Sequence, residues 1–176
     1  LIYKERRDVL DGMVISDKIL RMIDECIENA IGQYLAGDNT EWDLEGLKRH
    51  FYGIIFKEND LIYTPEELEA LTVDDLRKLM TSRAEEAYRF RLDALGEERF
   101  REIERIILLR AVDLKWMDHL DAMDDLRGSV GLNAYAHRNP LTEYRLAGGE
   151  MFDAMVAGIR EDTCRMILSF RTGETM

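Results

Sequence analysis

The stretch LRGSVGLNAYAHRNPLTEY, residues 126–144, separates the two longest helical patterns of this sequence. Neither proline nor glycine occurs over 97–127, which predicts one helix roughly 46 Å long at 1.5 Å per residue. After Pro140, apolar side chains recur every three or four residues from Phe152 to Phe170, which predicts a second long helix. We therefore expect the two helices to fold back on each other as an antiparallel hairpin.

The connection between these helices carries its own turn signals. We expect Gly128 to end the first helix in a left-handed conformation and Gly131 to allow a turn, while Asn139 caps a helix that begins at Pro140. A connection over 128–139 would exceed the roughly two to eight residues that usually close a helix hairpin. Because long loops in compact domains are often functional, the excess length favours a functional tip.

The side chains of this predicted tip are apolar, aromatic and basic on an otherwise acidic chain. They are Val130, Leu132, Tyr135, His137 and Arg138. Such a mixture suits transient contact with an extended peptide. The alternative, which stays open, is that Tyr135 and Leu132 tuck back between the helices as a small plug.

The first hairpin helix carries more apolar surface than one partner helix can cover. Its two predicted stripes are Phe100, Ile103, Ile107, Leu114 and Met117, and Ile106, Leu109, Trp116, Leu120 and Met123. We expect part of this surface to pack on something larger. In the second helix Gly148 and Gly149 each cost about 1 kcal/mol, which predicts a kink or a frayed first turn.

The residues before the hairpin predict a small all-helical lobe over 11–96. Ser16 and Asp17 are typical of a helix start, and the apolar pattern that follows runs to Tyr34. Three further starts are predicted from caps and capping boxes. They lie at Thr40 with Asp43, at Thr64-Pro65 with Glu67, and at Thr72 with Asp75, the last opening a helix that runs to Gly96. The predicted fold class is therefore all-α.

Composition excludes several classes of protein. With 24 basic and 36 acidic side chains the net charge is -12, so nucleic acid is not an expected partner, because phosphate binding needs clustered Lys and Arg. No apolar run is long enough to span a bilayer. Cys26 and Cys164 lie on separate helical patterns, which favours reduced core thiols over a disulfide. The chain begins inside an apparent helix without an initiator Met, so we expect it to be part of a longer protein.

The motifs of catalysis are missing from the sequence. No lysine is followed by Ser or Thr, so there is no phosphate-binding Walker A motif, and we expect neither catalytic residues nor ATP hydrolysis. Asp118, Asp121 and Asp125 lie at helical spacing beside His119, and a small metal-dependent enzyme on this acidic face is one alternative. A soluble all-helical adapter for protein interactions is the second alternative function.

The sequence AVDLKWMDHLDAMDDLRGSVGLNAYAHRNPLTEY, residues 111–144, with EMFDAM at 150–155, resembles the two-helix finger of SecA, the ATPase family that pushes preproteins through the bacterial SecY channel. YKERRDVL, residues 3–10, resembles the end of the long scaffold helix of that family. The chain departs from the family pattern at Asn133-Ala134 and at 137–139. The matching positions are Asp113, Trp116, His119, Leu120, Met123, Asp124, Leu126, Arg127, Tyr135, Ala136, Pro140, Glu143, Tyr144, Met151 and Phe152.

The resemblance implies a domain organisation and residue roles. Residues 1–10 would end the scaffold helix, 11–96 would form the helical wing domain, and 97–176 would form the scaffold finger. The residues that would contact the substrate are Tyr135, Leu132 and Arg138. Those that would pack on the motor domains are Trp116, Arg127 and Leu120.

The resemblance also implies partners and a location. The partners would be the SecA motor domains, the SecYEG channel and an unfolded preprotein, and an acidic lipid surface and a second copy of the chain are left open. ATP and Mg²⁺ would bind in the motor domains, so no cofactor and no metal are expected in this part. The chain would regulate ATP hydrolysis by the motor, in the cytoplasm and peripherally at the inner face of the cell membrane.

Overall fold

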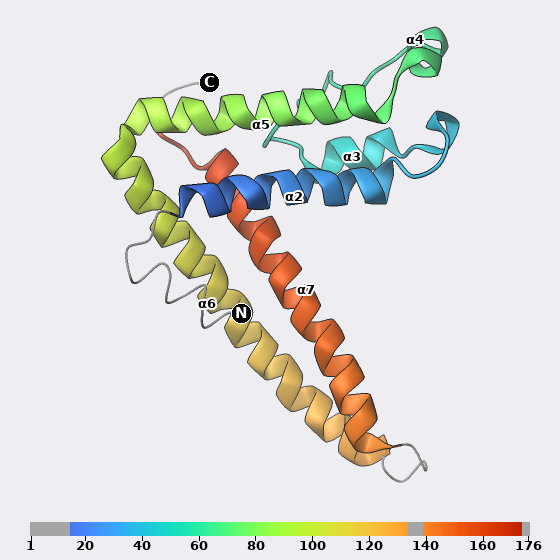
Figure 1. The fold of residues 1–176 in the computed structure, drawn as a ribbon, viewed down its shortest axis with the longest axis vertical. Helices are drawn as coiled ribbons and strands as arrows, with labels where there is room; N and C mark the ends of the chain where they lie inside the picture. The colour runs from blue at the N-terminus through green and yellow to red at the C-terminus, as the bar shows by residue number, and fades with distance from the viewer. Residues whose placement is uncertain (1–14, 134–138, 174–176) are drawn as a thin grey trace. The chain divides into compact units, whose positions relative to one another are not determined.

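The computed structural model describes residues 15–133 and 139–173, and within them the chain is all-α, as predicted (Figure 1). Apart from helices and loops it has one isolated bridge, between Tyr52 and Phe56, in this described part. The helices are α2 (Ser16–Tyr34), the 3-10 helix η1 (Asn39–Glu41), α3 (Leu44–His50), α4 (Pro65–Ala70), α5 (Val73–Leu95), α6 (Glu97–Asn133) and α7 (Pro140–Ser169).

Internal contacts group the described residues into two compact units. One comprises 15–104 together with 164–173 and is called the helical lobe here. The other comprises 105–163 and is called the hairpin unit. Both α6 and α7 contribute one end to the lobe and the rest to the hairpin unit. The predicted division into scaffold, wing and finger domains stays a prediction.

The start of α2 differs in detail from the sequence prediction. The cap position is Ile15, and no side chain caps the helix. Ser16 is buried instead, and its hydroxyl donates a hydrogen bond to Glu104 Oε1 at 2.8 Å. The helix thus begins where predicted, but Ser16 serves a long-range contact because a buried carboxylate competes for its hydroxyl.

The predicted pairing of Thr40 with Asp43 is wrong. Thr40 lies inside η1, which is capped by Asp38 with Glu41 as its partner. Asp43 is itself the cap of α3, accepting a hydrogen bond from the Gly46 amide at 2.8 Å. Both Asp38 and Asp43 are good cap residues because a short carboxylate can reach the free amides of the first turn.

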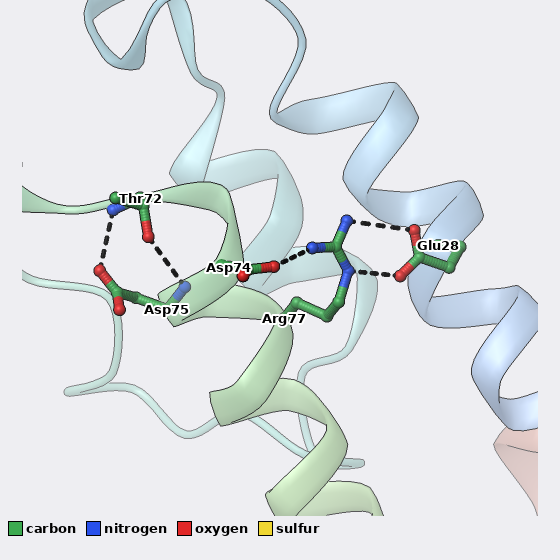
Figure 2. Close-up of polar contacts among 5 residues, drawn as sticks. All are labelled: Glu28, Thr72, Asp74, Asp75 and Arg77. Atoms are coloured by element: carbon green, nitrogen blue, oxygen red, sulfur yellow. Dashed lines mark hydrogen bonds and ion pairs between the residues drawn. The ribbon is translucent and has the colours of Figure 1, made fainter.

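The two later helix starts are confirmed. Thr64 and Glu67 form a reciprocal capping box with Pro65 in the first turn of α4. At α5 the Thr72 amide donates to Asp75 Oδ2 at 3.0 Å, and the Asp75 amide donates to Thr72 Oγ1 at 3.1 Å (Figure 2). The helix ends as predicted at Gly96, whose φ of 80° is one that glycine adopts without strain.

The core of the lobe is the seam between α2 and α5, which run side by side (Figure 1). Its α2 side is Ile19, Ile23, Cys26, Ile27, Ala30 and Ile31, and its α5 side is Leu76, Met80, Ala84, Ala87 and Tyr88. At one end of the seam Arg77 reaches from α5 to Glu28 of α2, with Nε to Oε1 at 2.6 Å, and also pairs with Asp74 (Figure 2). The prediction of reduced core thiols is confirmed, since Cys26 and Cys164 are both buried and neither forms a disulfide.

A buried carboxylate joins three helices of the lobe. Glu104 of α6 is fully buried and accepts hydrogen bonds from Ser16 of α2, from the Tyr88 hydroxyl of α5 at 2.9 Å, and from Arg101 Nη1 at 2.7 Å. Burial raises the pKa of Tyr88 to about 12, and the neighbouring Glu104 charge adds to the effect. A buried charge is tolerated only when it is paired and hydrogen-bonded in this way.

Replacing Glu104 with Leu is expected to lower the free energy of unfolding by about 3 kcal/mol, because the buried Ser16 and Tyr88 hydroxyls and the partly buried Arg101 lose their acceptor together. Urea denaturation followed by circular dichroism measures the loss. The exposed Asp93, changed to Ala, is the matched control and should shift stability by less than about 0.5 kcal/mol. Equal stability of the two variants would show that the network contributes nothing.

Candidate functional site

The two helices of the hairpin unit are antiparallel, as predicted. Lys115 Nζ of α6 lies 3.4 Å from Asp162 Oδ2 of α7, and the rings of His119 and Phe152 lie 5.9 Å apart. Further along, Met123 comes close to Gly148. Residue numbers rise along α6 as they fall along α7, so the helices run in opposite directions side by side (Figure 1).

The predicted end of the first helix is wrong. The helix α6 continues through Gly128 and Gly131 to Asn133, a length of 37 residues. Neither glycine has a positive φ, and a glycine inside a helix costs only about 1 kcal/mol, which the flanking turns can offset. The connection to α7 therefore shortens to 134–139, an ordinary length for a hairpin, so loop length no longer argues for a functional tip.

The three predicted substrate-contacting residues cannot be placed by this structure. Tyr135 and Arg138 lie outside the described residues. Leu132 lies in the last turn of α6, with only its backbone described. Both interpretations of the tip, contact with a peptide and insertion between the helices, stay predictions.

The predicted start of the second helix is confirmed. Asn139 Oδ1 accepts hydrogen bonds from the amides of Leu141 at 3.2 Å and Thr142 at 3.3 Å, and Pro140 is the first residue of α7. An asparagine cap followed by a proline with a preset φ is a favourable helix start. The cap thus defines where α7 begins.

The expected interruption at Gly148-Gly149 is wrong, because α7 runs unbroken from Pro140 to Ser169. A Cβ placed on Gly148 would lie 3.1 Å from Met123 Cε, whereas one on Gly149 would meet nothing within 4 Å. Gly148 therefore has a packing role, because it admits the Met123 side chain of α6. The sequence held a signal for this, since Gly148 falls on the same 3.6-residue stripe as Phe152, Met155 and Ile159.

The solvent-exposed side of α6 in the hairpin unit carries five large apolar side chains among charged ones. It is called the exposed apolar face here and consists of Ile106, Leu114, Trp116, Met117 and Leu120. At about 3.6 residues per turn these five lie on one side of the helix, opposite the buried Leu108, Ala111 and Val112. Met117 is 63% exposed and Leu120 is 47% exposed. The expected surplus of apolar surface is thus present, and it draws on both predicted stripes: Leu114 and Met117 come from one, and Ile106, Trp116 and Leu120 from the other.

The structure brings the predicted motor-packing residues to one side of α6. Trp116 and Leu120 lie within the exposed apolar face, and Arg127 continues the same side about two turns further at 3.6 residues per turn. Arg127 pairs with Asp124 at 3.7 Å, but both side chains are exposed, and such a pair stabilises a helix very little. The Arg127 guanidinium therefore stays available to a partner.

Sequence reasoning missed the role of Lys115. Its side chain crosses α7 over Gly158, where a Cβ would lie 3.2 Å from Lys115 Cε, and ends in the ion pair with Asp162. Glycine at 158 leaves room for the aliphatic part of that lysine. The signal was weak, because a single lysine between apolar residues usually lies on a solvent-facing side.

The other chemistry considered from the sequence finds little support in this part of the chain. No three His, Cys, Asp or Glu side chains gather as a metal site among the described residues, and Asp118, Asp121 and Asp125 are exposed. Within the same residues, none of the helices combines the length and the apolar character that crossing a membrane requires. The exposed apolar face is the feature of the hairpin that calls for a partner.

Comparison with known proteins identifies the family. The family model described as SecA Wing and Scaffold domain matches residues 1–171. The chain belongs to the SecA wing and scaffold family. It is 43% identical over 169 residues to the protein translocase subunit SecA of Pelotomaculum thermopropionicum and 41% identical over 170 residues to that of Carboxydothermus hydrogenoformans.

These SecA relatives are much longer than the chain. The matches cover 95% and 96% of the chain but only 19% of each relative. A third relative, from Desulforamulus reducens, is 40% identical with the same 19% coverage of its own length. The chain thus corresponds to about a fifth of a SecA protein, and the wing and scaffold description agrees with an all-α lobe joined to a long hairpin.

The two adjacent glycines of α7 should respond differently to alanine. Gly149→Ala is expected to stabilise the chain by about 0.5–1 kcal/mol, since alanine favours the helix and nothing lies in its way. Gly148→Ala should gain less, because the Met123 side chain must move. Urea denaturation of both variants measures the difference. A larger gain at position 148 than at 149 would contradict the packing of Met123 against Gly148.

Proposed function

We propose that this chain is the wing and scaffold part of a SecA-type protein translocase and that it acts there without catalytic chemistry of its own. The observation that carries the proposal is the exposed apolar face on a hairpin of a chain that spans only 19% of its relatives. A helix face that exposes Met117 and Leu120 is costly in water and favours burial against another domain. The missing part of such a protein is the natural partner.

In this proposal the exposed apolar face packs on the motor domains. Trp116 and Leu120 would form the apolar contact, and Arg127 would supply a charged group at its edge. The hairpin is well suited to transmit a restraint, because α6 is fixed against α7 at Lys115, His119 and Met123. Contact at this face would thereby regulate ATP hydrolysis, with ATP and Mg²⁺ bound in the motor domains.

The tip residues Tyr135, Leu132 and Arg138 would contact the unfolded preprotein at the SecYEG channel. The family match supports this role, and Asn139, the residue next to Arg138 in the chain, caps α7. An aromatic ring and an apolar side chain make contacts that tolerate many sequences, as a translocated chain requires. The working location would be the cytoplasm, peripherally at the membrane that holds the channel.

The packing proposal is tested by adding the chain to a separately produced motor part of the same protein. The wild-type chain is expected to bind and to lower ATP turnover. Leu120→Asp should weaken binding at least tenfold, because it buries an unpaired charge in the contact. Glu150→Gln, at an exposed position of α7, should change nothing. Equal binding by both variants would contradict the face assignment, and sedimentation would reveal whether the face pairs two copies of the chain instead.

The tip proposal is tested in the complete translocase. Tyr135→Ala is expected to reduce preprotein translocation severalfold while basal ATP hydrolysis stays nearly constant, because the contact is made with the substrate and not with nucleotide. Tyr52→Ala is the matched control, since Tyr52 is an exposed tyrosine of the lobe. Unchanged translocation by the Tyr135 variant would remove the tip assignment and favour an adapter that binds a folded partner.

A further inference from the structure

A pocket of the helical lobe combines basic and apolar residues. It has a volume of about 350 Å³ and lies between the segment that follows α3 and the second half of α5. Its lining residues are Gly53, Ile54, Ile55, Phe56, Lys57, Asp60, Arg83, Glu86 and Arg91. The pocket belongs entirely to the lobe and shares no residue with the hairpin unit.

One ion pair in the pocket is already complete. Arg83 Nη1 lies 2.9 Å from Asp60 Oδ2, and Nη2 lies 3.1 Å from Oδ1, while Nη1 also donates to the Ile55 carbonyl. The hydrogen bonds from Arg83 lower the pKa of Asp60. This bidentate pair is electrically neutral as a unit, so it shapes the wall without attracting a charged ligand.

Arg91 is a buried cation without a carboxylate partner. The residue is 9% exposed, and its guanidinium donates to two carbonyls, from Nε to Phe170 O at 2.8 Å and from Nη1 to Ala87 O at 2.9 Å. No carboxylate of the described residues pairs with it, and burial alone lowers the pKa of its guanidinium. A buried charge without a counterion is costly, and an anion in the pocket would remove that cost.

The contact of Arg91 with the end of α7 uses only some of the hydrogen-bond donors of its guanidinium. Phe170 directly follows α7, so its carbonyl belongs to the negative end of that helix, which offers about half a unit of opposite charge. A guanidinium has five N–H groups in a planar fork, and the two bonds to carbonyls leave donors for a ligand. The ring of Phe170 lies 5.5 Å from the guanidinium carbon and adds a weak contact.

The charge of the pocket selects the kind of anion. Lys57, Arg83 and Arg91 carry +3 and Asp60 and Glu86 carry -2, which leaves +1 in a chain whose net charge is -12. A single surplus positive charge matches a monoanion better than a doubly charged phosphate. The wall formed by Ile54, Ile55 and Phe56 suits an apolar group attached to that anion.

We propose that this pocket binds a carboxylate joined to an apolar group. The carboxylate pairs with the Arg91 guanidinium and the Lys57 ammonium, and the apolar group lies against Ile54 and Phe56. A peptide ending in an apolar residue and a short fatty acid share this chemistry. The proposal rests on the geometry of the lobe alone and is independent of the proposed function of the hairpin.

Titration calorimetry of the chain with a short peptide ending in leucine tests the proposal directly. The free acid is expected to bind, and its C-terminal amide should bind at least tenfold more weakly, because it lacks the charge that Arg91 requires. Hexanoate as a second probe decides whether the ligand must be a peptide. Tighter binding of inorganic phosphate than of the acid, or no heat with either acid up to about 10 mM, would overturn the proposal.

A pair of charge-reversal variants locates the binding. Lys57→Glu should weaken binding of the free-acid peptide at least tenfold. Lys78→Glu makes the same change at an exposed α5 position outside the pocket and should leave the affinity nearly unchanged. Because both side chains are exposed, both variants are expected to fold, which thermal melts verify. In NMR spectra the amide signals of Ile54 and Phe56 should shift with the acid. Equal affinity of the two variants would exclude this pocket as the site.

Discussion

The helical lobe depends on one buried carboxylate. Glu104 accepts hydrogen bonds from Ser16 at the start of α2, from Tyr88 of α5 and from Arg101 of α6. These donors come from three helices, so the position of each is constrained by the same two oxygens. A charged acceptor makes stronger hydrogen bonds than a neutral one, and an unpaired buried charge is costly. The network therefore favours one arrangement of these helices over alternatives in which any donor is missing.

Packing in the hairpin unit follows a different rule, because glycines and flexible side chains decide how closely the helices approach. Gly148 faces Met123, and Gly158 faces the aliphatic part of Lys115. With α6 fixed against α7 in this way, the opposite side of α6 presents a row of apolar residues to solvent. A hairpin with an uncovered apolar face agrees with a chain that corresponds to about a fifth of its SecA relatives. The lobe adds a second feature, a pocket whose buried Arg91 pairs with no carboxylate among the described residues.

Much of the architecture could be predicted from local sequence signals. The capping boxes at Thr64 and Thr72, the glycine stop at Gly96 and the Asn139-Pro140 start all act within one helical turn, and the structure confirms each of them. The apolar repeats likewise predicted the long helices and the fold class. These signals succeed because hydrogen bonds between residues close in the chain do not depend on the rest of the fold.

The incorrect predictions share a physical cause. Gly128 and Gly131 carry the residue type of a helix stop, but glycine only weakens a helix, and the length of α6 is decided by the whole helix rather than by one residue. Ser16 has the residue type of a cap, yet its hydroxyl turns to a carboxylate 88 positions further along the chain. At the site, the sequence predicted surplus apolar surface on α6 but not which residues would stay exposed, and the exposed ones come from both predicted stripes.

The sequence by itself thus determined the all-α class, the antiparallel hairpin and most helix ends, because these follow from the spacing of apolar residues and from hydrogen bonds within one helical turn. Only the tertiary structure decided which side of α6 stays uncovered and why α7 continues through Gly148. It also decided that Arg91 is buried beside a pocket and, within 15–133 and 139–173, pairs with no carboxylate. Those features depend on which distant side chains meet, and no local pattern encodes the burial that gives a charge or an apolar face its energetic cost.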